Sequence, residues 1–151
     1  MNLSYEIIDR FIDAGDASAL LYAPLSEPLT FRKTRRYEFD VEGDAAAVEA
    51  FVRHTLLDDV SQELHIGDDP ALDGARFVLD YGMKPGALDL EKETIVKFFR
   101  GLDAPGFTLT SLTIRQRVYV FGEGAADPKR FIRDICNPAI QNWTVIEPTH
   151  V

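Results

Sequence analysis

"FIRDICNPAIQNWTVI", from Phe131 to Ile146, is the stretch that decides the fold, because "FVRHTLLDDVSQELHI", from Phe51 to Ile66, follows the same plan. Each stretch opens with Phe, a β-branched residue and Arg, continues to an Asn-Pro or Asp-Asp pair, and reaches a Gln before a strand-like ending. An internal repeat dictates an architecture, because each copy must form the same supersecondary unit.

The match extends upstream of both stretches. "RRYEFDVEGD" (Arg35–Asp44) corresponds to "QRVYVFGEGA" (Gln116–Ala125), and "SYEIIDRF" (Ser4–Phe11) corresponds to "RFVLDYGM" (Arg76–Met83). Each half therefore reads as a strand, a connecting segment, a second strand, a helix and a short strand.

These matches predict the division of the chain. We expect one repeat unit over residues 1–67 and a second over 76–151, joined by a linker at 68–75. The linker belongs to "GDDPALDGA", whose Gly, Pro and Asp residues are typical of turns.

Three helices have recognisable starts. Asp44 is an N-cap in front of an apolar face, and Asp127 followed by Pro128 opens the equivalent helix of the second half. Asp89 caps the helix after "KPGA", with an apolar stripe of Ile95, Phe98, Phe99 and Leu102. The first half has room there only for a short helix or a loop, "DAGDASALLYAPLSEP".

The pattern predicts an α+β protein of two repeated units, each with a small antiparallel sheet and helices on one face. A unit of half this length has a marginal core, so the two units are expected to pack as an internal pseudo-dimer.

Bulk composition narrows the function. The chain has 151 residues and a formal net charge of −9, which argues against nucleic-acid and membrane-surface binding. It has no long apolar run and no signal-peptide pattern. Its one cysteine, Cys136, excludes an internal disulfide and fits a reducing compartment, so we expect a cytoplasmic protein.

Four features in order resemble the PurS family, the small subunit of phosphoribosylformylglycinamidine synthase. A first strand ends in Lys84-Pro85-Gly86, Leu88-Asp89 follows, a middle strand starts with basic residues (Arg115–Phe121), and Asn137-Pro138 precedes the last strand. The resemblance covers residues 75–147. The first half lacks Lys-Pro-Gly and has Asp58-Asp59 where Asn-Pro would fall.

The resemblance implies ferredoxin-like subdomains and a role in de novo purine biosynthesis, either as a separate subunit or as the PurS-like N-terminal domain of the single-chain enzyme. In this family the PurS-like part carries no catalytic group. It bridges an ATP-using synthetase and a glutaminase that supplies ammonia, so the chain would be a ligase component without a cofactor of its own.

The residues themselves predict no active site. Cys136 has no histidine near it in sequence to act as a base, and His54, His65 and His150 lack the spacing of metal ligands. The carboxylates of "GDDPALDG" lack the spacing of a calcium loop, and the Gly-x-Gly of "GEGAADP" is too short for a phosphate loop. No catalytic, cofactor or metal residue is predicted.

Basic residues cluster in "FRKTRR", and Arg117 begins the equivalent strand of the second half. If the strands alternate, Arg32, Arg36 and Arg117 lie on the face opposite the apolar residues. One interpretation is a solvated basic strand end. The other is a basic patch that meets an acidic partner surface or a phosphate.

The same alternation places Tyr119 and Phe121 on the outer face, where two aromatic side chains indicate contact with something. The candidates are the other half of the chain, a second copy, and the synthetase. The turn Gly82–Gly86 is a docking element or only a strand-to-helix connection. The residues expected to mediate interaction are Arg32, Arg36, Arg117, Tyr119, Phe121, Lys84, Pro85, Gly86, Asn137 and Pro138.

Two other function classes stay open from the sequence. A ferredoxin-like regulatory domain would bind a small anionic ligand between the two halves, with arginines holding the anion. An independent small enzyme is disfavoured because no catalytic constellation is present.

Overall fold

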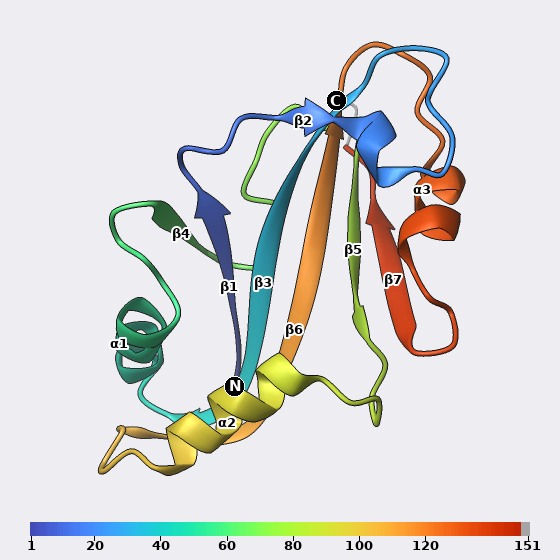
Figure 1. Ribbon diagram of the computed structural model, residues 1–151. Helices are drawn as coiled ribbons and strands as arrows, with labels where there is room; N and C mark the ends of the chain where they lie inside the picture. The colour runs from blue at the N-terminus through green and yellow to red at the C-terminus, as the bar shows by residue number, and fades with distance from the viewer. Residues whose placement is uncertain (149–151) are drawn as a thin grey trace. The chain divides into compact units, whose positions relative to one another are not determined.

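The computed structural model describes residues 1–148, and it has the α+β fold with antiparallel strands that the sequence predicts (Figure 1). The strands form one seven-stranded sheet, however, and not the separate small sheet expected in each unit. The helices are α1 (Ala45–Thr55), α2 (Leu90–Arg100), α3 (Pro128–Ile135) and the 3₁₀ helix η1 (Ala17–Leu20). The strands are β1 (Asn2–Asp9), β2 (Gly15–Asp16), β3 (Thr30–Gly43), β4 (Gln62–Ile66), β5 (Phe77–Met83), β6 (Phe107–Phe121) and β7 (Gln141–Ile146). Their order in the sheet is β4-β1-β3-β6-β5-β7, and β2 pairs with β3.

The chain forms two compact units that draw on both halves of the sequence. Unit 1 contains residues 1–11, 35–69 and 88–115, and unit 2 contains residues 12–34, 70–87 and the chain from 116 onward. Helix α2 thus belongs to unit 1, whereas β2 and η1 belong to unit 2. The repeat boundaries at 1–67, 68–75 and 76–151 stay a prediction, because compactness in space and repetition in sequence divide a chain differently.

The core of unit 1 lies between its strands and α1. Strands β1 and β3 pair with Tyr5 opposite Tyr37, and every second residue of both strands faces the core. Helix α1 contributes Val48, Phe51 and Val52, and the Phe51 ring meets that of Phe39 edge to face at 6.3 Å.

Helix α2 contributes less to this core than its sequence predicts. Ile95 is its one buried residue, whereas Phe98 is 52% exposed and Leu102, just beyond the helix, is 37% exposed. The predicted apolar stripe of α2 is therefore buried only in part, because α2 contacts the core through a narrower face.

The core of unit 2 lies between β5, the second half of β6, and α3. Phe131 of α3 is fully buried, and its ring packs on that of Phe77 with centroids 5.3 Å apart. Leu79 of β5 and Val118 and Val120 of β6 complete the contact. The segment before β3 adds Ala17 and Leu29 to the same cluster.

The predicted helix starts are confirmed by their hydrogen bonds. Asp44 accepts from the Ala46 backbone N–H at 3.0 Å, Asp89 accepts from Lys92 at 3.1 Å, and Asp127 accepts from Lys129 at 3.1 Å. The short helix expected in the first-half connecting segment is η1.

Within residues 1–148, no helix is long and apolar enough to cross a membrane. His150 lies outside the described residues.

Candidate interaction site at the ends of β5 and β7

Arg36, which was expected to point to solvent, makes its contacts with other residues of the chain. Arg36 is 8% exposed, and its Nη1 donates to Ser4 Oγ at 3.2 Å and to Glu38 Oε1 at 2.6 Å. Asp68 of the linker lies 3.7 Å from the same nitrogen. The interpretation of Arg36 as a solvated strand end is therefore wrong, because β1 and the linker enclose it.

Arg117 in unit 2 is enclosed more completely. Its Nε donates to Asp80 Oδ2 at 2.9 Å, and the two side chains are 2% and 4% exposed. A buried carboxylate next to a buried guanidinium needs this partner, because an unpaired charge in the interior is costly. The outward, solvated position expected for Arg117 is also wrong.

The two aromatic residues after Arg117 contact the chain itself. Tyr119 is fully buried, and its hydroxyl accepts a hydrogen bond from the Ala71 backbone N–H at 3.0 Å. Phe121, which is half-buried, stacks on Tyr119 with ring centroids 6.4 Å apart. The contact observed at Tyr119 is with the chain's own linker, which was not among the candidates considered from the sequence. Sequence patterns gave no sign of it, because the linker lies far from Tyr119 in sequence.

Arg35, an exposed basic residue of "FRKTRR", forms an ion pair with a glutamate of α2. Arg35 Nη1 lies 2.6 Å from Glu91 Oε1 of α2, and the Tyr37 hydroxyl donates to the same oxygen at 3.2 Å. Burial raises the pKa of Tyr37, so this hydroxyl keeps its proton over the ordinary pH range. Arg32 is half-buried in unit 2.

The five remaining predicted residues come together at one place. The Lys84 backbone N–H donates to the Ile140 carbonyl at 2.8 Å, directly beyond the β5–β7 pair of Met83 and Gln141. This bond places the turn Lys84–Gly86 beside the turn Asn137–Ile140, and we call the two turns the β5–β7 corner. Lys84, Pro85, Gly86, Asn137 and Pro138 are all exposed.

Local chemistry fixes the second turn of the corner. Asn137 Oδ1 accepts from the Ala139 N–H at 3.0 Å, and Asn137 O accepts from the Gln141 N–H at 2.8 Å. Gln141 Oε1 closes the turn by accepting from the Asn137 N–H at 2.7 Å. An Asn side chain that bonds the backbone two residues on is typical of such turns, and Pro138 fixes φ inside it.

The first turn is fixed in a similar way. The Ala87 N–H donates to Lys84 O at 3.0 Å, and Gly86 has a φ of 88°, where a residue with a side chain would be strained. The corner is therefore ordered without being buried.

The surface of the corner is apolar and nearly uncharged. Ile140 is 42% exposed and Trp143, which follows it on β7, is 36% exposed. Residues 137–146 contain no charged side chain, and Lys84 adds one positive charge. Few charges around an exposed aromatic residue are typical of protein interfaces. Ile140 and Trp143 are not predicted from the sequence as interaction residues, although the uncharged run 137–146 is a signal that points to them.

The end of β1 and the start of β4 form a second corner with the same hydrogen bonds. The Arg10 N–H donates to Ser61 O at 2.8 Å, and Asp58 O accepts from the Gln62 N–H at 2.8 Å. Asp58 Oδ1 accepts from the Val60 N–H at 3.0 Å, and Gln62 Oε1 accepts from the Asp58 N–H at 3.0 Å. We call this the β1–β4 corner.

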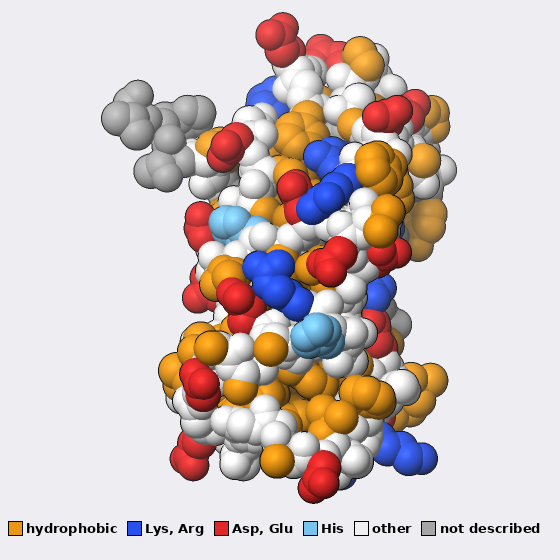
Figure 2. All heavy atoms as spheres, turned by 90° about the vertical axis from the view of Figure 1, so that its left-hand side faces the viewer, with side chains coloured by type: hydrophobic (Ala, Val, Ile, Leu, Met, Phe, Trp, Pro, Cys, Tyr) orange, Lys and Arg blue, Asp and Glu red, His pale blue; other side chains and the backbone are white. Residues whose placement is uncertain are grey.

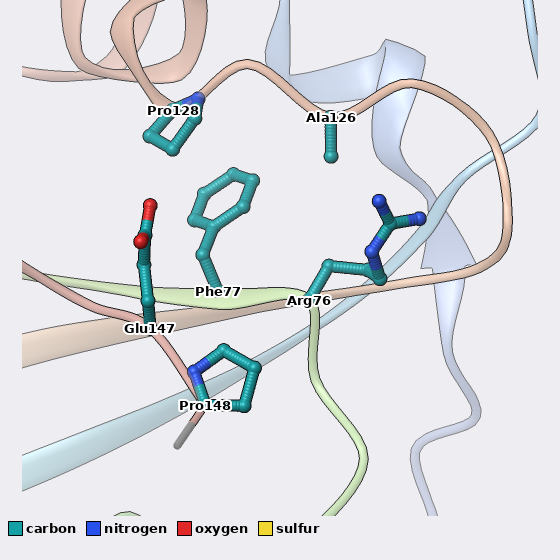
Figure 3. A pocket seen from close by; sticks show the side chains of 6 residues that line it. All are labelled: Arg76, Phe77, Ala126, Pro128, Glu147 and Pro148. Carbon is teal, nitrogen blue, oxygen red and sulfur yellow. The ribbon is translucent and has the colours of Figure 1, made fainter. Parts of the chain in front are cut away.

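A half-open pocket of about 310 Å³ lies in unit 2, beneath the loop before α3 (Figure 3). Its lining residues are Arg76, Phe77, Ala126, Pro128, Glu147 and Pro148. Arg76 is already occupied, because its Nη1 donates to the carbonyls of Gly122 and Gly124 at 2.9 Å each. Arg76 therefore holds the "GEGA" loop in place, which accounts for the Gly-x-Gly as a turn.

Residues 1–148 contain no group of three or more His, Cys, Asp and Glu side chains that could hold a metal ion. Cys136 is buried. On the face that carries β4 and α1, acidic, basic and hydrophobic side chains are interspersed (Figure 2). The visible charges on that face do not gather into the cationic surface that a nucleic acid would need.

No family model, no curated protein and no solved structure matches this chain.

Proposed function

We propose that the chain is a non-catalytic, PurS-like component of a phosphoribosylformylglycinamidine synthase, which bridges the synthetase and the glutaminase in the cytoplasm. One observation carries the proposal: the bond from Lys84 N–H to Ile140 O brings Lys-Pro-Gly and Asn-Pro together. These are two of the four sequence features on which the family resemblance rests, and both are exposed.

The proposal includes an internal repeat. Asp58 and Gln62 make the same three hydrogen bonds in the β1–β4 corner as Asn137 and Gln141 make in the β5–β7 corner. The bond from Arg10 to Ser61 corresponds to the bond from Lys84 to Ile140, both at 2.8 Å. Two side chains with one pattern of bonds, at an offset of about 79 residues, support a duplicated unit in one chain.

A protein that bridges two enzymes needs surfaces that bind them and does not need catalytic side chains. The β5–β7 corner offers an exposed apolar surface with a single cation, Lys84, on a protein of net charge −9. A partner that binds there would present apolar groups and at least one carboxylate, because such a surface complements both features.

Reconstitution with a synthetase and a glutaminase tests the proposal. Glutamine-dependent formylglycinamidine synthesis should require the chain, and the chain should co-elute with the synthetase. Lys84→Glu should weaken both by about tenfold, the cost of placing a like charge against a carboxylate in an interface.

Arg10→Glu is the matched control, since Arg10 has the same backbone position in the β1–β4 corner. It should leave turnover unchanged. The proposal is wrong if turnover is the same with and without the chain. A thermal-shift screen with small anions would then test the regulatory-domain hypothesis.

A further inference from the structure

The outer edge of β7 is an open strand edge. Strand β7 ends the sheet order, and among residues 1–148 its pairing partner is β5. The bond from Lys84 N–H to Ile140 O marks that pair as hydrogen-bonded, so the alternation of an antiparallel ladder makes the pairs Gly82–Asn142 and Asp80–Thr144 hydrogen-bonded as well. The backbone N–H and C=O groups of Trp143 and Val145 therefore point away from β5, to the open edge.

The residues along this edge lack the usual protection. Natural edge strands carry charged side chains, above all lysine, or proline, which keep other strands from pairing. The other terminal strand, β4, carries Glu63 and His65, whereas β7 reads "QNWTVI" without an ionisable residue. Asn142, Trp143 and Thr144 are all exposed. Strand β7 contains no proline; the prolines nearest to it in sequence are Pro138 before it and Pro148 after it.

We propose that β7 pairs with β7 of a second copy of this chain, antiparallel and with the two-fold axis at Thr144. In this register, Trp143 of each copy lies opposite Val145 of the other. The backbone groups that point outward then form hydrogen bonds with one another, and an aromatic residue faces a β-branched one, a favourable cross-strand pair.

A second copy is the occupant that fits this edge, because the strand is self-complementary and adds no charge to the contact. Two chains of net charge −9 repel each other, and an approach along a charged edge would add to that repulsion. Strand β7 brings no charge to the pairing, and two identical strands that run antiparallel are self-complementary about a two-fold axis. The prolines at 138 and 148 limit the pairing to a strand about as long as β7 itself.

Sedimentation over about a hundred-fold range of protein concentration tests this proposal. The wild-type chain should pass from monomer to dimer. Thr144→Lys places two cations directly opposite each other across the axis, and it should raise the dimer dissociation constant by about tenfold or more. The fluorescence of Trp143, the one tryptophan of the chain, should shift as the wild-type dimer forms, whereas the Thr144→Lys chain should show no such shift.

His65→Lys is the matched control, because it adds the same charge to the other terminal strand, and it should leave the dimer intact. A mixture of Thr144→Lys and Thr144→Glu chains should form a heterodimer, which separates a repelled interface from a misfolded variant. The proposal is overturned if the wild type stays monomeric over the whole range, if both lysine variants behave alike, or if the mixture fails to associate. None of these outcomes bears on the synthetase assay, because that assay varies Lys84.

Discussion

The β1–β4 and β5–β7 corners share a set of hydrogen bonds and differ in charge. Asp58 and Asn137 play the same part, since each accepts from the N–H two residues on with its Oδ1 at 3.0 Å. Around that shared frame the first corner carries Asp58-Asp59 and the second carries Asn137-Pro138. The comparison teaches that the turn needs a short side-chain acceptor, whereas the charge of that side chain is free to vary.

A second comparison concerns the arginines on the polar face of each unit. Arg117 is paired with a carboxylate that is 4% exposed, whereas Arg36 is paired with Glu38, which is 31% exposed, and with Asp68, which is 82% exposed. Solvent screens the contacts of Arg36 and not those of Arg117. Loss of a partner should therefore cost more in unit 2 than in unit 1.

The largest effect is expected at the buried pair. Asp80→Ala should lower the free energy of unfolding by about 3–5 kcal/mol, because it leaves a buried guanidinium without its carboxylate. Glu38→Ala should cost about 1 kcal/mol or less, because Glu38 is partly exposed to solvent and Arg36 keeps its contacts with Ser4 and Asp68. Urea denaturation followed by circular dichroism measures both. A double variant, Asp80→Leu with Arg117→Met, should recover much of the lost free energy of unfolding, because no buried charge is left unpaired. If Asp80→Ala and Glu38→Ala lower the free energy of unfolding equally, burial does not distinguish the two ion pairs.

The next effect concerns the turn acceptors. Asn137→Ala should cost about 1 kcal/mol, because the Ala139 N–H loses its acceptor, Asn137 Oδ1. Asp58→Ala should lower the urea midpoint as well, because the Val60 N–H loses its acceptor. Asn137→Asp is the control, since it keeps an Oδ1 acceptor for the Ala139 N–H. If Asn137→Ala leaves the midpoint unchanged, the bonds at this turn do not stabilise the fold.

Much of this frame was predictable from the sequence because it is local. The caps at Asp44, Asp89 and Asp127 depend on neighbours within three residues, and all three form as expected. The parallel between "DDVSQ" and "NPAIQ" was visible as a pattern for the same reason.

The features that the sequence did not predict depend on long-range packing. The burial of Arg117 follows from its bond to Asp80, 37 residues away in the chain. Periodicity assigned Arg117 to a face of β6, but no periodicity tells whether a distant segment of the chain will bury that face. The β5–β7 corner was unpredicted as a unit for the same reason, since only the pairing of β5 with β7 brings Lys84 to Ile140.

A smaller effect is expected from exchanging the two turn residues. Asp58→Asn and Asn137→Asp should each keep the hydrogen bonds of the turn, because Asn and Asp both place an Oδ1 acceptor at the same point. The urea midpoints should stay close to that of the wild type. In the reconstituted enzyme, however, Asn137→Asp should weaken binding to a partner that presents a carboxylate. Equal binding by the two variants would show that charge at the corners does not select the partner.

The smallest effect is a difference in pH response between the corners. The Val60 N–H and the Ser61 hydroxyl hold the pKa of Asp58 below its ordinary value, whereas the Asn137 amide does not titrate. A depressed pKa means that the stabilisation by Asp58 is complete above the ordinary pKa of an aspartate and is lost as the pH falls through the lowered value. In an NMR titration the amide proton of Val60 should therefore shift on acidification with the lowered pKa, while that of Ala139 should not follow it. Asp58→Asn should abolish the shift at Val60, and a Val60 amide that titrates at an ordinary aspartate pKa would show that the bond is not made in solution.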